Sequence, residues 1–431
     1  MIKDFFRQLA NLKFAIGLLL IIALISSIGS IIEQDKDILF YQKHYSNQIF
    51  GVGYWEIISM IGLNTIYKNW WFLSLLFLLS LSLIACTIFQ QLPTLKFSKR
   101  FYFYKQANQF KKLPFKLRGY KIFSGNLEHN LIQNEYSIFR QRNTTYAYKG
   151  LISRIGPIFV HMSIICVLFG STIDALQGFS SQEIVPKTEL FHTQNIIKHG
   201  SFSFVPQKTF RINDFWSNYI NSGHPRQFYS DISILSGDGI EIERKTISVN
   251  NPFLTDNLLL YQTDWGILGL RTEIMTNHHS NYVFQLPVSK IQNTSSQKIW
   301  ISWIADKTET EKSSIIVIKD IRGQVNVYTR QGRFLTSANL NDRIFWTNLL
   351  DYKFIELISS AGLQIKSDPG IKLTYVGFST LIGSSILSYI SFSEFWLLSS
   401  TQSTIFVGGR SNRAKLKYNL EFTKFKQSLL E

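Results

Sequence analysis

Four long apolar runs alternate with polar stretches along this chain of 431 residues. The runs cover residues 14–32, 71–90, 155–173 and 372–393. Apart from Lys372 at the start of the last run, they contain no Asp, Glu, Lys or Arg. Each run is about as long as a helix needs to cross a bilayer. The pattern therefore predicts a membrane protein with four transmembrane α-helices.

The polar stretch between the third and fourth runs, residues 174–371, predicts a different kind of structure. Asp231–Leu235 and Ile240–Arg244 flank the turn sequence Ser-Gly-Asp-Gly, which is a strong hairpin signal. Ile315–Ile318 and Val325–Tyr328 flank another turn. About ten short strands without helical periodicity are typical of a sandwich. We therefore expect a large β-rich, sandwich-like extramembrane domain here.

The charge distribution supports a membrane topology. Of the formal net charge of +16, most lies in residues 91–154, which hold thirteen Lys and Arg against two Glu. The positive-inside rule places such stretches on the inner side, together with the basic N-terminus and tail. Aromatic residues are interleaved there, as in proteins that bind single-stranded nucleic acid. A position beside anionic lipid headgroups already explains the charge, so we expect membrane lipid and no nucleic acid as a partner.

These patterns divide the chain into consecutive segments. The first half consists of a basic N-terminus with the first helix (1–32), a short outer loop (33–70), the second helix (71–90) and a basic inner loop (91–154). The second half consists of the third helix (155–173), the outer β-rich domain (174–371), the fourth helix (372–393) and a basic inner tail (394–431). The outer loop includes an amphipathic piece, roughly Tyr54 to Tyr67. In the tail, Gly408-Gly409 lacks the strand-turn-helix frame of a phosphate loop, and we expect it to face headgroups.

The third run contains one ionisable side chain, His161. A polar group inside a bilayer is costly and normally has a partner. On a helical wheel Gly156, Ser163 and Gly170 share one sector with Cys166, roughly opposite His161, and such small residues favour packing on the protein's own helices. We therefore expect His161 to point away from its own bundle. It then meets a second subunit or ligates haem, whose iron accepts a neutral imidazole nitrogen. The alternative is a histidine that bonds a neighbouring carbonyl.

The chain has two cysteines, Cys86 and Cys166, both in apolar runs and without a CxxC pair. Packing as small hydrophobes is the simplest role for them. A transmembrane thiol or electron carrier is the alternative. The remaining histidines of the outer segments are expected in surface or turn positions: His44, His192, His199, His224, His278 and His279.

Short stretches along the whole chain resemble the ResB/CcsB family of system II cytochrome c maturation, with the plastid and cyanobacterial branch as the nearest match. They include Gly29–Gln34, Asn69–Phe72, Ala85–Thr87, Gln91–Lys96, Lys149–His161, Phe228–Asp231, Val249–Pro252, Tyr261–Gly266, Gly362–Lys366, Asp368–Gly370 and Gly408–Lys415. Each stretch alone is weak evidence. Their order, on the expected sides of the expected helices, makes the resemblance specific.

The resemblance implies a subunit that works with a CcsA-type tryptophan-rich membrane protein. Together they carry haem across the membrane and attach it to apocytochrome c on the lumenal side. It implies that His161 is an axial haem ligand, and that Tyr261, Asp264 and Trp265 are candidates for contacting the partner or apocytochrome. The resemblance further implies that the haem is b-type, transiently bound and shared with the partner. The tryptophan-rich segment is absent from this chain, so we do not expect it to be catalytic alone.

The resemblance also implies a location, namely a chloroplast thylakoid membrane, or a cyanobacterial or bacterial membrane, with the large domain in the lumen. Two other functions stay open, the thiol carrier named above and a purely structural scaffold for a membrane complex. For Tyr261–Gly266 the simpler interpretation is a strand that ends in a tight turn capped by Asp264.

Overall fold

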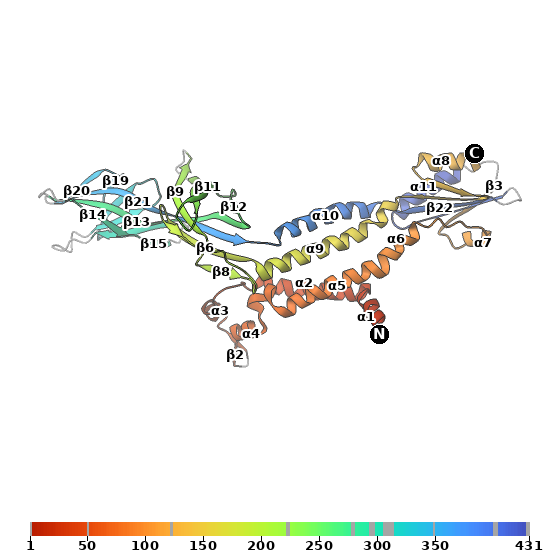
Figure 1. Cartoon of the computed structure of the whole chain (residues 1–431), viewed down its shortest axis with the longest axis horizontal. Helices are drawn as coiled ribbons and strands as arrows, with labels where there is room; N and C mark the ends of the chain where they lie inside the picture. The colour runs from red at the N-terminus through yellow and green to blue at the C-terminus, as the bar shows by residue number, and fades with distance from the viewer. Residues whose placement is uncertain are drawn as a thin grey trace. The chain divides into compact units, whose positions relative to one another are not determined.

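The computed structural model describes residues 2–49, 51–120, 124–220, 225–276, 281–292, 298–304, 314–347, 350–399 and 404–427. The chain divides into two compact units. Unit 1 comprises Met1–Ala175 and Gly370–Glu431, and unit 2 comprises Leu176–Pro369. Figure 1 labels many of the elements of each unit.

Three helices among the described residues are long and apolar enough to cross a membrane. The first is α2 (Leu12–Ile31). The second, Trp70–Ser98, and the third, Leu151–Gln177, are built from consecutive elements: α5 (Trp70–Cys86), η2 (Thr87–Gln91) and α6 (Leu92–Ser98), then η4 (Leu151–Arg154) and α9 (Gly156–Gln177). The second and third helices therefore extend beyond the uncharged runs of the sequence.

The fourth apolar run forms α10 (Ile371–Tyr389), a helix of 19 residues. It lies beside α9 in Figure 1, and the two backbones approach closely at several points. A Cβ atom added to Gly377 would lie 2.7 Å from Val167 Cγ2, and one added to Gly170 would lie 2.9 Å from Gly370 O. The Ser163 hydroxyl donates a hydrogen bond to Thr380 Oγ1 (2.9 Å). The small-residue face of α9 therefore packs on α10, as the wheel predicted.

The opposite face of α9 packs as well, and here the wheel prediction is wrong. Ile164, Ile165 and Leu168 lie against a buried cluster of Leu18, Leu79 and Leu83 on α2 and α5. The face that carries His161 is therefore turned towards the chain's own helices. An apolar face is equally suited to lipid and to neighbouring helices, so its composition alone did not distinguish the two.

The residues between the first two apolar helices form short elements. They are α3 (Ile38–His44), β1 (Gln48–Ile49), β2 (Val52–Gly53), α4 (Tyr54–Ile61) and η1 (Leu63–Lys68), and α1 (Ile2–Leu9) precedes α2. Gly62 ends α4 in a left-handed backbone conformation (φ 77°). Glycine suits this position because a residue with a side chain would be strained there. The predicted amphipathic piece is therefore two short helices.

The basic stretch and the tail, which we expected to be a loop and a headgroup-facing segment, fold together into one antiparallel sheet with the strand order β3-β23-β22-β5-β4. Its elements are β3 (Phe115–Tyr120), β4 (Ser137–Gln141), β5 (Thr144–Lys149), β22 (Ser393–Ser399) and β23 (Thr404–Ser411), with α7 (Ala107–Phe110), α8 (Ser124–Gln133) and α11 (Lys415–Gln427). Buried clusters line both faces of this sheet, centred on Phe395 and Trp396.

Gly408-Gly409 lies in the middle of β23 and not in an exposed tail. A Cβ atom on Gly408 would lie 2.3 Å from Leu113 Cδ1, and one on Gly409 would collide with the Tyr418 hydroxyl. These glycines let a loop side chain and α11 approach the strand closely. The phosphate-loop interpretation is thereby excluded for this pair.

Beyond the end of α9 at Gln177, the regular elements of unit 2 among its described residues are all strands, which form sheets of four, seven and five strands. Its strands are β6 (Phe179–Pro186), β7 (Leu190–Phe191), β8 (Ile196–His199), β9 (Thr209–Tyr219), β10 (Pro225–Leu235), β11 (Glu241–Ser248), β12 (Phe253–Thr255), β13 (Leu258–Thr276), β14 (Asn281–Pro287), β15 (Ser289–Gln292), β16 (Lys298–Ile304), β17 (Ser314–Ile318), β18 (Val325–Thr329), β19 (Phe334–Ala338), β20 (Arg343–Thr347) and β21 (Leu350–Ser367). Both predicted hairpins are confirmed, β10 with β11 and β17 with β18.

Unit 2 has two hydrophobic cores, whereas the sequence suggested one sandwich of short strands. The long strands β13 and β21 pair along almost their whole length and contribute to both cores. One core includes Phe210 and Ile232 of the four-stranded sheet, and the other includes Trp300 and Ile316 of the five-stranded sheet. Trp265 packs against both cores, so it lies where they meet.

Candidate functional site

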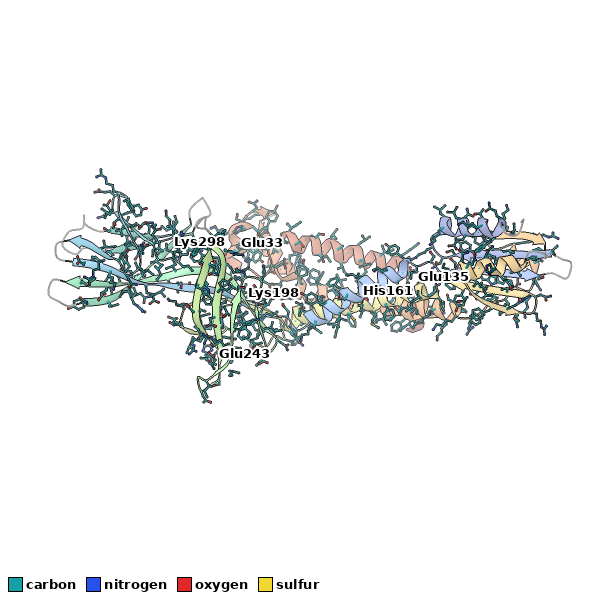
Figure 2. All side chains as sticks on the ribbon, turned by 90° about the horizontal axis from the view of Figure 1, so that it is seen from above. Glu33, Glu135, His161, Lys198, Glu243 and Lys298 are labelled. Carbon is teal, nitrogen blue, oxygen red and sulfur yellow. The ribbon has the colours of Figure 1, made fainter. Side chains whose placement is uncertain are left out.

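His161 lies in the second turn of α9, close to the end that follows the basic stretch. Figure 2 labels it in the helical part of unit 1. Its side chain is half-buried, and its partners come from the second apolar helix. The histidine is therefore bonded within its own bundle. Its partners are side chains of another helix together with the backbone carbonyl of Leu83 on that helix, so the sequence-based alternative of a carbonyl partner is borne out in part.

The hydrogen bonds of His161 define which ring nitrogen carries the proton. Thr87 Oγ1 lies 3.0 Å from His161 Nδ1 and donates its own hydrogen to Leu83 O (2.8 Å). Because a hydroxyl has one hydrogen, it accepts from Nδ1–H of the imidazole. His161 Nε2 then carries the lone pair. The Gln91 side-chain amide nitrogen lies 3.1 Å from Nε2 and 3.2 Å from Nδ1, so it contacts the face of the ring and not the lone pair of one nitrogen.

Both partners of His161 come from one irregular turn. Thr87 and Gln91 are the first and last residues of η2, a π-helical segment that interrupts the long helix Trp70–Ser98. Such π-turns widen a helix locally and occur frequently at functional sites. This turn places two polar side chains, four residues apart, against the same imidazole.

A cavity of about 530 Å³ adjoins His161. It is lined by Pro157, Val160, His161, Ser385, Ser388, Tyr389 and Arg413. The lining combines an imidazole, apolar surface from α9 and a guanidinium, all from unit 1. A metal-binding histidine usually donates its second ring N–H to a polar partner, as His161 does to Thr87. These residues therefore fit an apolar, iron-containing group that carries acidic substituents.

Comparison with known proteins decides the family. The model of the ResB-like family matches residues 12–310 and 284–423. The chain belongs to the ResB-like family. This ResB-like chain is 42% identical over 424 residues to the protein named "Cytochrome c biogenesis protein Ccs1" of Thalassiosira pseudonana, covering 98% of this chain and 99% of that one.

Two further relatives extend the comparison. The protein of the same name from Phaeodactylum tricornutum is 43% identical over 424 residues, covering 98% of this ResB-like chain and 99% of that one. "Cytochrome c biogenesis protein CcsB" of Microcystis aeruginosa is 38% identical over 427 residues, covering 97% and 94%. The similarity therefore spans both units, and the family resemblance seen in the sequence is confirmed.

Several stretches that carried the resemblance meet at this site of the ResB-like chain. Thr87 ends one of them, Gln91 begins the next, and Arg154 and His161 lie in a third. Arg413, from the stretch near the C-terminus, lines the same cavity. Sequence analysis singled out only His161. Thr87 and Gln91 could have been found as well, because they are polar residues at the end of an apolar run.

The candidates Tyr261, Asp264 and Trp265 lie in the first half of β13. The pairing of β13 with β21 shifts register between Gln262 and Asp264, so this segment is a bulge and the predicted tight turn is wrong. Trp265 is half-buried and stacks on Phe228 (5.5 Å between ring centroids). Asp264 is exposed and forms an ion pair with Lys298, whose ammonium lies 5.3 Å from the centre of the Trp265 ring.

The pKa of Asp264 is lowered. Partial burial opposes ionisation of its carboxyl, but hydrogen bonds from the Lys298 ammonium and the Trp265 backbone N–H outweigh that burial. Asp264 is therefore a carboxylate at neutral pH. Its exposed side chain is available to a partner, whereas most of Trp265 is committed to the two cores.

The other histidines and the cysteines show no second site in the described part of the chain. His44, His192 and His199 each lie 3.2–3.3 Å from a backbone carbonyl, and His224, His278 and His279 lie outside the described residues. Cys86 and Cys166 are free thiols. Among the described residues, no group of three or more His, Cys, Asp or Glu has the arrangement to hold a metal ion.

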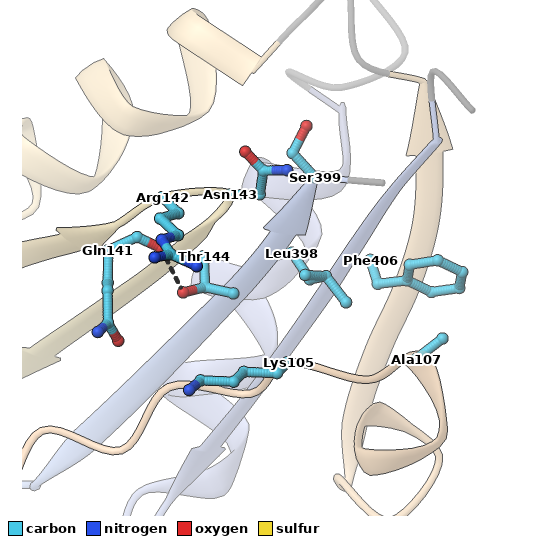
Figure 3. A pocket seen from close by; sticks show the side chains of 9 residues that line it. All are labelled: Lys105, Ala107, Gln141, Arg142, Asn143, Thr144, Leu398, Ser399 and Phe406. Atoms are coloured by element: carbon cyan, nitrogen blue, oxygen red, sulfur yellow. Dashed lines mark hydrogen bonds between the residues drawn. The ribbon is translucent and has the colours of Figure 1, made fainter. Parts of the chain in front are cut away.

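A second cavity, of about 610 Å³, opens on the sheet of unit 1 beside Lys105, Arg142 and Phe406 (Figure 3). Most of its polar lining residues are exposed, and none carries a buried polar atom without a partner among the described residues. By contrast, most polar residues that line the cavity at His161 are half-buried, and one of them, Ser388, has a buried hydroxyl without a partner.

Proposed function

We propose that this chain acts in cytochrome c biogenesis as a membrane subunit that holds haem at His161 and presents apocytochrome c for haem attachment. The names of the relatives support a role in cytochrome c biogenesis, and the similarity to these relatives extends over nearly the full length of the chain. The observation that carries the haem site is the imidazole of His161, which lines a cavity and already donates Nδ1–H to Thr87.

When bound, haem supplies an iron that accepts an imidazole nitrogen and a macrocycle that is passed to apocytochrome c. Thr87 fixes the ring tautomer and orientation of His161, so the lone pair stays on Nε2. The Gln91 amide contacts the face of the imidazole, 3.1 Å from Nε2 and 3.2 Å from Nδ1, and would help to hold the ring in place. Pro157 and Val160 of α9 supply apolar surface beside the ring in the cavity.

The proposal includes a partner and a topology. A CcsA-type tryptophan-rich protein would complete the haem site, since this chain contributes one intramembrane histidine. Because α10 lies along α9, we infer that α10 is a fourth transmembrane helix. The basic sheet domain then lies on the inner side and unit 2 on the lumenal side of a thylakoid, cyanobacterial or bacterial membrane. Unit 2 would contact apocytochrome c or the partner through the surface around Tyr261, Asp264 and Trp265.

The test is haem ligation by the purified full-length chain in detergent, alone and with the partner. We expect His161→Ala to change the Soret band and the resonance Raman signature of axial ligation. Added imidazole should restore both in His161→Gly. The matched control is His129→Ala, because His129 is exposed on α8. An unchanged spectrum in His161→Ala would refute haem ligation by His161.

A further inference from the structure

Four buried polar atoms without a hydrogen-bond partner gather in one small region of unit 1. They are Gln91 Oε1, Ser153 Oγ, Arg154 Nε and Ser388 Oγ, and they come from η2, η4 and α10. Buried polar groups are normally paired, because an unpaired one loses its hydration without compensation. Three of the four atoms, on Ser153, Arg154 and Ser388, can donate a hydrogen bond, so the cluster indicates a missing acceptor.

All four residues line one cavity of about 250 Å³. Its lining is Gln90, Gln91, Thr94, Ser153, Arg154, Pro157, Ser388, Asn412 and Arg413. The lining includes two guanidinium groups and no Asp or Glu. Ser153, with 4% of its surface exposed, is the most deeply buried of the four residues with unpaired atoms, and its hydroxyl is one of them.

The nearby acidic residue does not neutralise Arg154. Glu394, 6% exposed, pairs with Arg410 at 2.6 Å and also accepts from the Tyr146 hydroxyl. The Arg154 guanidinium lies 4.7 Å from the centre of the Phe392 ring, and no ion pair joins it to any carboxylate of the described residues. Arg154 is half-buried, and the charge of Glu394 that acts on it is shared with Arg410, so its own charge is only partly compensated. Water would satisfy the hydroxyls of this cavity but would not supply the missing negative charge.

We propose that this cavity is an oxyanion site for a carboxylate or a phosphate group. Ser153, Arg154 and Ser388 supply unpaired donors, and Arg413 supplies a second positive charge. Gln91 is not part of this donor set, because its amide lies against His161 and its unpaired atom is an acceptor.

The oxyanion site borders the cavity at His161. Both cavities share Pro157, Ser388 and Arg413 in their linings. One ligand can therefore span them, with its anionic group at Arg154 and its metal at His161. The carboxylates of haem are one source of the anion, and that part rests on the proposed function. The phosphate of an anionic lipid headgroup is the other source and is independent of it.

The first experiment measures haemin binding to the full-length chain in detergent by Soret titration. Haemin is compared with its dimethyl ester, which has the same macrocycle without free carboxylates. If haem supplies the anion, the ester binds wild type roughly tenfold or more weakly than haemin, and Arg154→Gln binds both equally. Arg140→Gln is the matched control, since Arg140 lies on β4 with a side chain that is 70% exposed.

The second experiment reconstitutes the same proteins in nanodiscs of phosphatidylglycerol or phosphatidylcholine and measures retained lipid by native mass spectrometry. If a headgroup supplies the anion, wild type and Arg140→Gln retain phosphatidylglycerol and Arg154→Gln loses it. Should Arg154→Gln melt below the control, Ser153→Ala with Ser388→Ala replaces it. A response in either experiment supports the oxyanion site and identifies its source. The absence of both responses overturns it.

The two proposals fail separately. Equal binding of haemin and its ester to wild type, with ligation by His161 intact, removes the carboxylate source and leaves the haem function in place. Loss of haem ligation by His161, with phosphatidylglycerol retention still dependent on Arg154, refutes the haem function and supports the oxyanion site.

Discussion

Thr87 Oγ1 lies 3.0 Å from Nδ1 of His161 and connects two apolar helices through one hydrogen bond. The residues are 74 positions apart in sequence. The bond orients the imidazole and assigns its proton to Nδ1, because the Thr87 hydroxyl donates its only hydrogen to Leu83 O. The same contact that helps to hold α9 against the second apolar helix therefore also orients His161 for the haem ligation that we propose.

Replacing Thr87 should weaken haem binding without removing the ligand. Thr87→Val keeps the shape of the side chain and removes the acceptor, so we expect haemin affinity to fall about tenfold to hundredfold. Thr87→Ser keeps the acceptor and should bind like wild type. Soret titration of the full-length chain measures both. Equal affinity of Thr87→Val and wild type would show that His161 needs no such partner.

Replacing Gly377 of α10 by alanine should disturb the contact between α9 and α10, whereas replacing Gly383 should not. At Gly377 a Cβ atom would lie 2.7 Å from Val167 and 3.0 Å from Ser163 O, whereas at Gly383 nothing lies within 4 Å. We expect Gly377→Ala to destabilise the protein by about 1–3 kcal/mol through overpacking. Gly383→Ala should be neutral or slightly stabilising, since Ala favours helix. Thermal unfolding in detergent compares them, and equal melting temperatures would contradict this packing.

How far the sequence predicts this fold depends on how local each signal is. The stripe of Gly156, Ser163 and Gly170 predicted close helix packing correctly, because residue size alone permits backbones to approach. The direction of His161 was not predictable in the same way. Its partners Thr87 and Gln91 come from another helix, and the π-turn that presents them has no period of its own.

The sheet of unit 1 shows the same limit. Each strand of the basic stretch and of the tail is short and carries charge, so each alone resembles a loop. β22 pairs with β5, and Tyr146 bonds Glu394 across 248 positions of sequence. These segments become stable strands because pairing buries their side chains, and that burial depends on segments that are distant in sequence. The two cores of unit 2 escaped prediction because β13 and β21 are long enough to serve both.

The proposed topology places the sheet of unit 1 and the whole of unit 2 on opposite sides of the membrane. Single cysteines report this in a chain with Cys86→Ser and Cys166→Ser, because both native cysteines lie in apolar helices. Gln141→Cys, exposed at the end of β4, should react with a membrane-impermeant maleimide only from the inner side. Asp238→Cys, exposed in the β10–β11 turn, should react only from the lumenal side. Labelling of both from one side would refute the topology.

The ion pair between Asp264 and Lys298 should make the stability of unit 2 depend on pH in the acid range. Burial of Asp264 opposes ionisation, but Lys298 and the Trp265 N–H lower its pKa in the folded chain below its usual value. A lowered pKa means that this stabilisation is fully present above about pH 4, where the unfolded chain titrates, and is lost as pH falls through the folded pKa. Because the Asp264 side chain is 52% exposed, solvent screening keeps the effect small.

Urea unfolding of wild type and Asp264→Asn between pH 7 and pH 3, followed by tryptophan fluorescence, measures this dependence. Trp265 lies at the ion pair, and the centroid of its ring is 4.8 Å from that of Trp300, so the emission of these two residues reports the local change. We expect wild type to be the more stable protein at pH 7 and the difference to narrow as pH falls below 4. Asp238→Asn, exposed in a turn, should match wild type throughout. A difference that widens on acidification would mean that Asp264 is stabilised as the neutral acid and that Lys298 is not its partner.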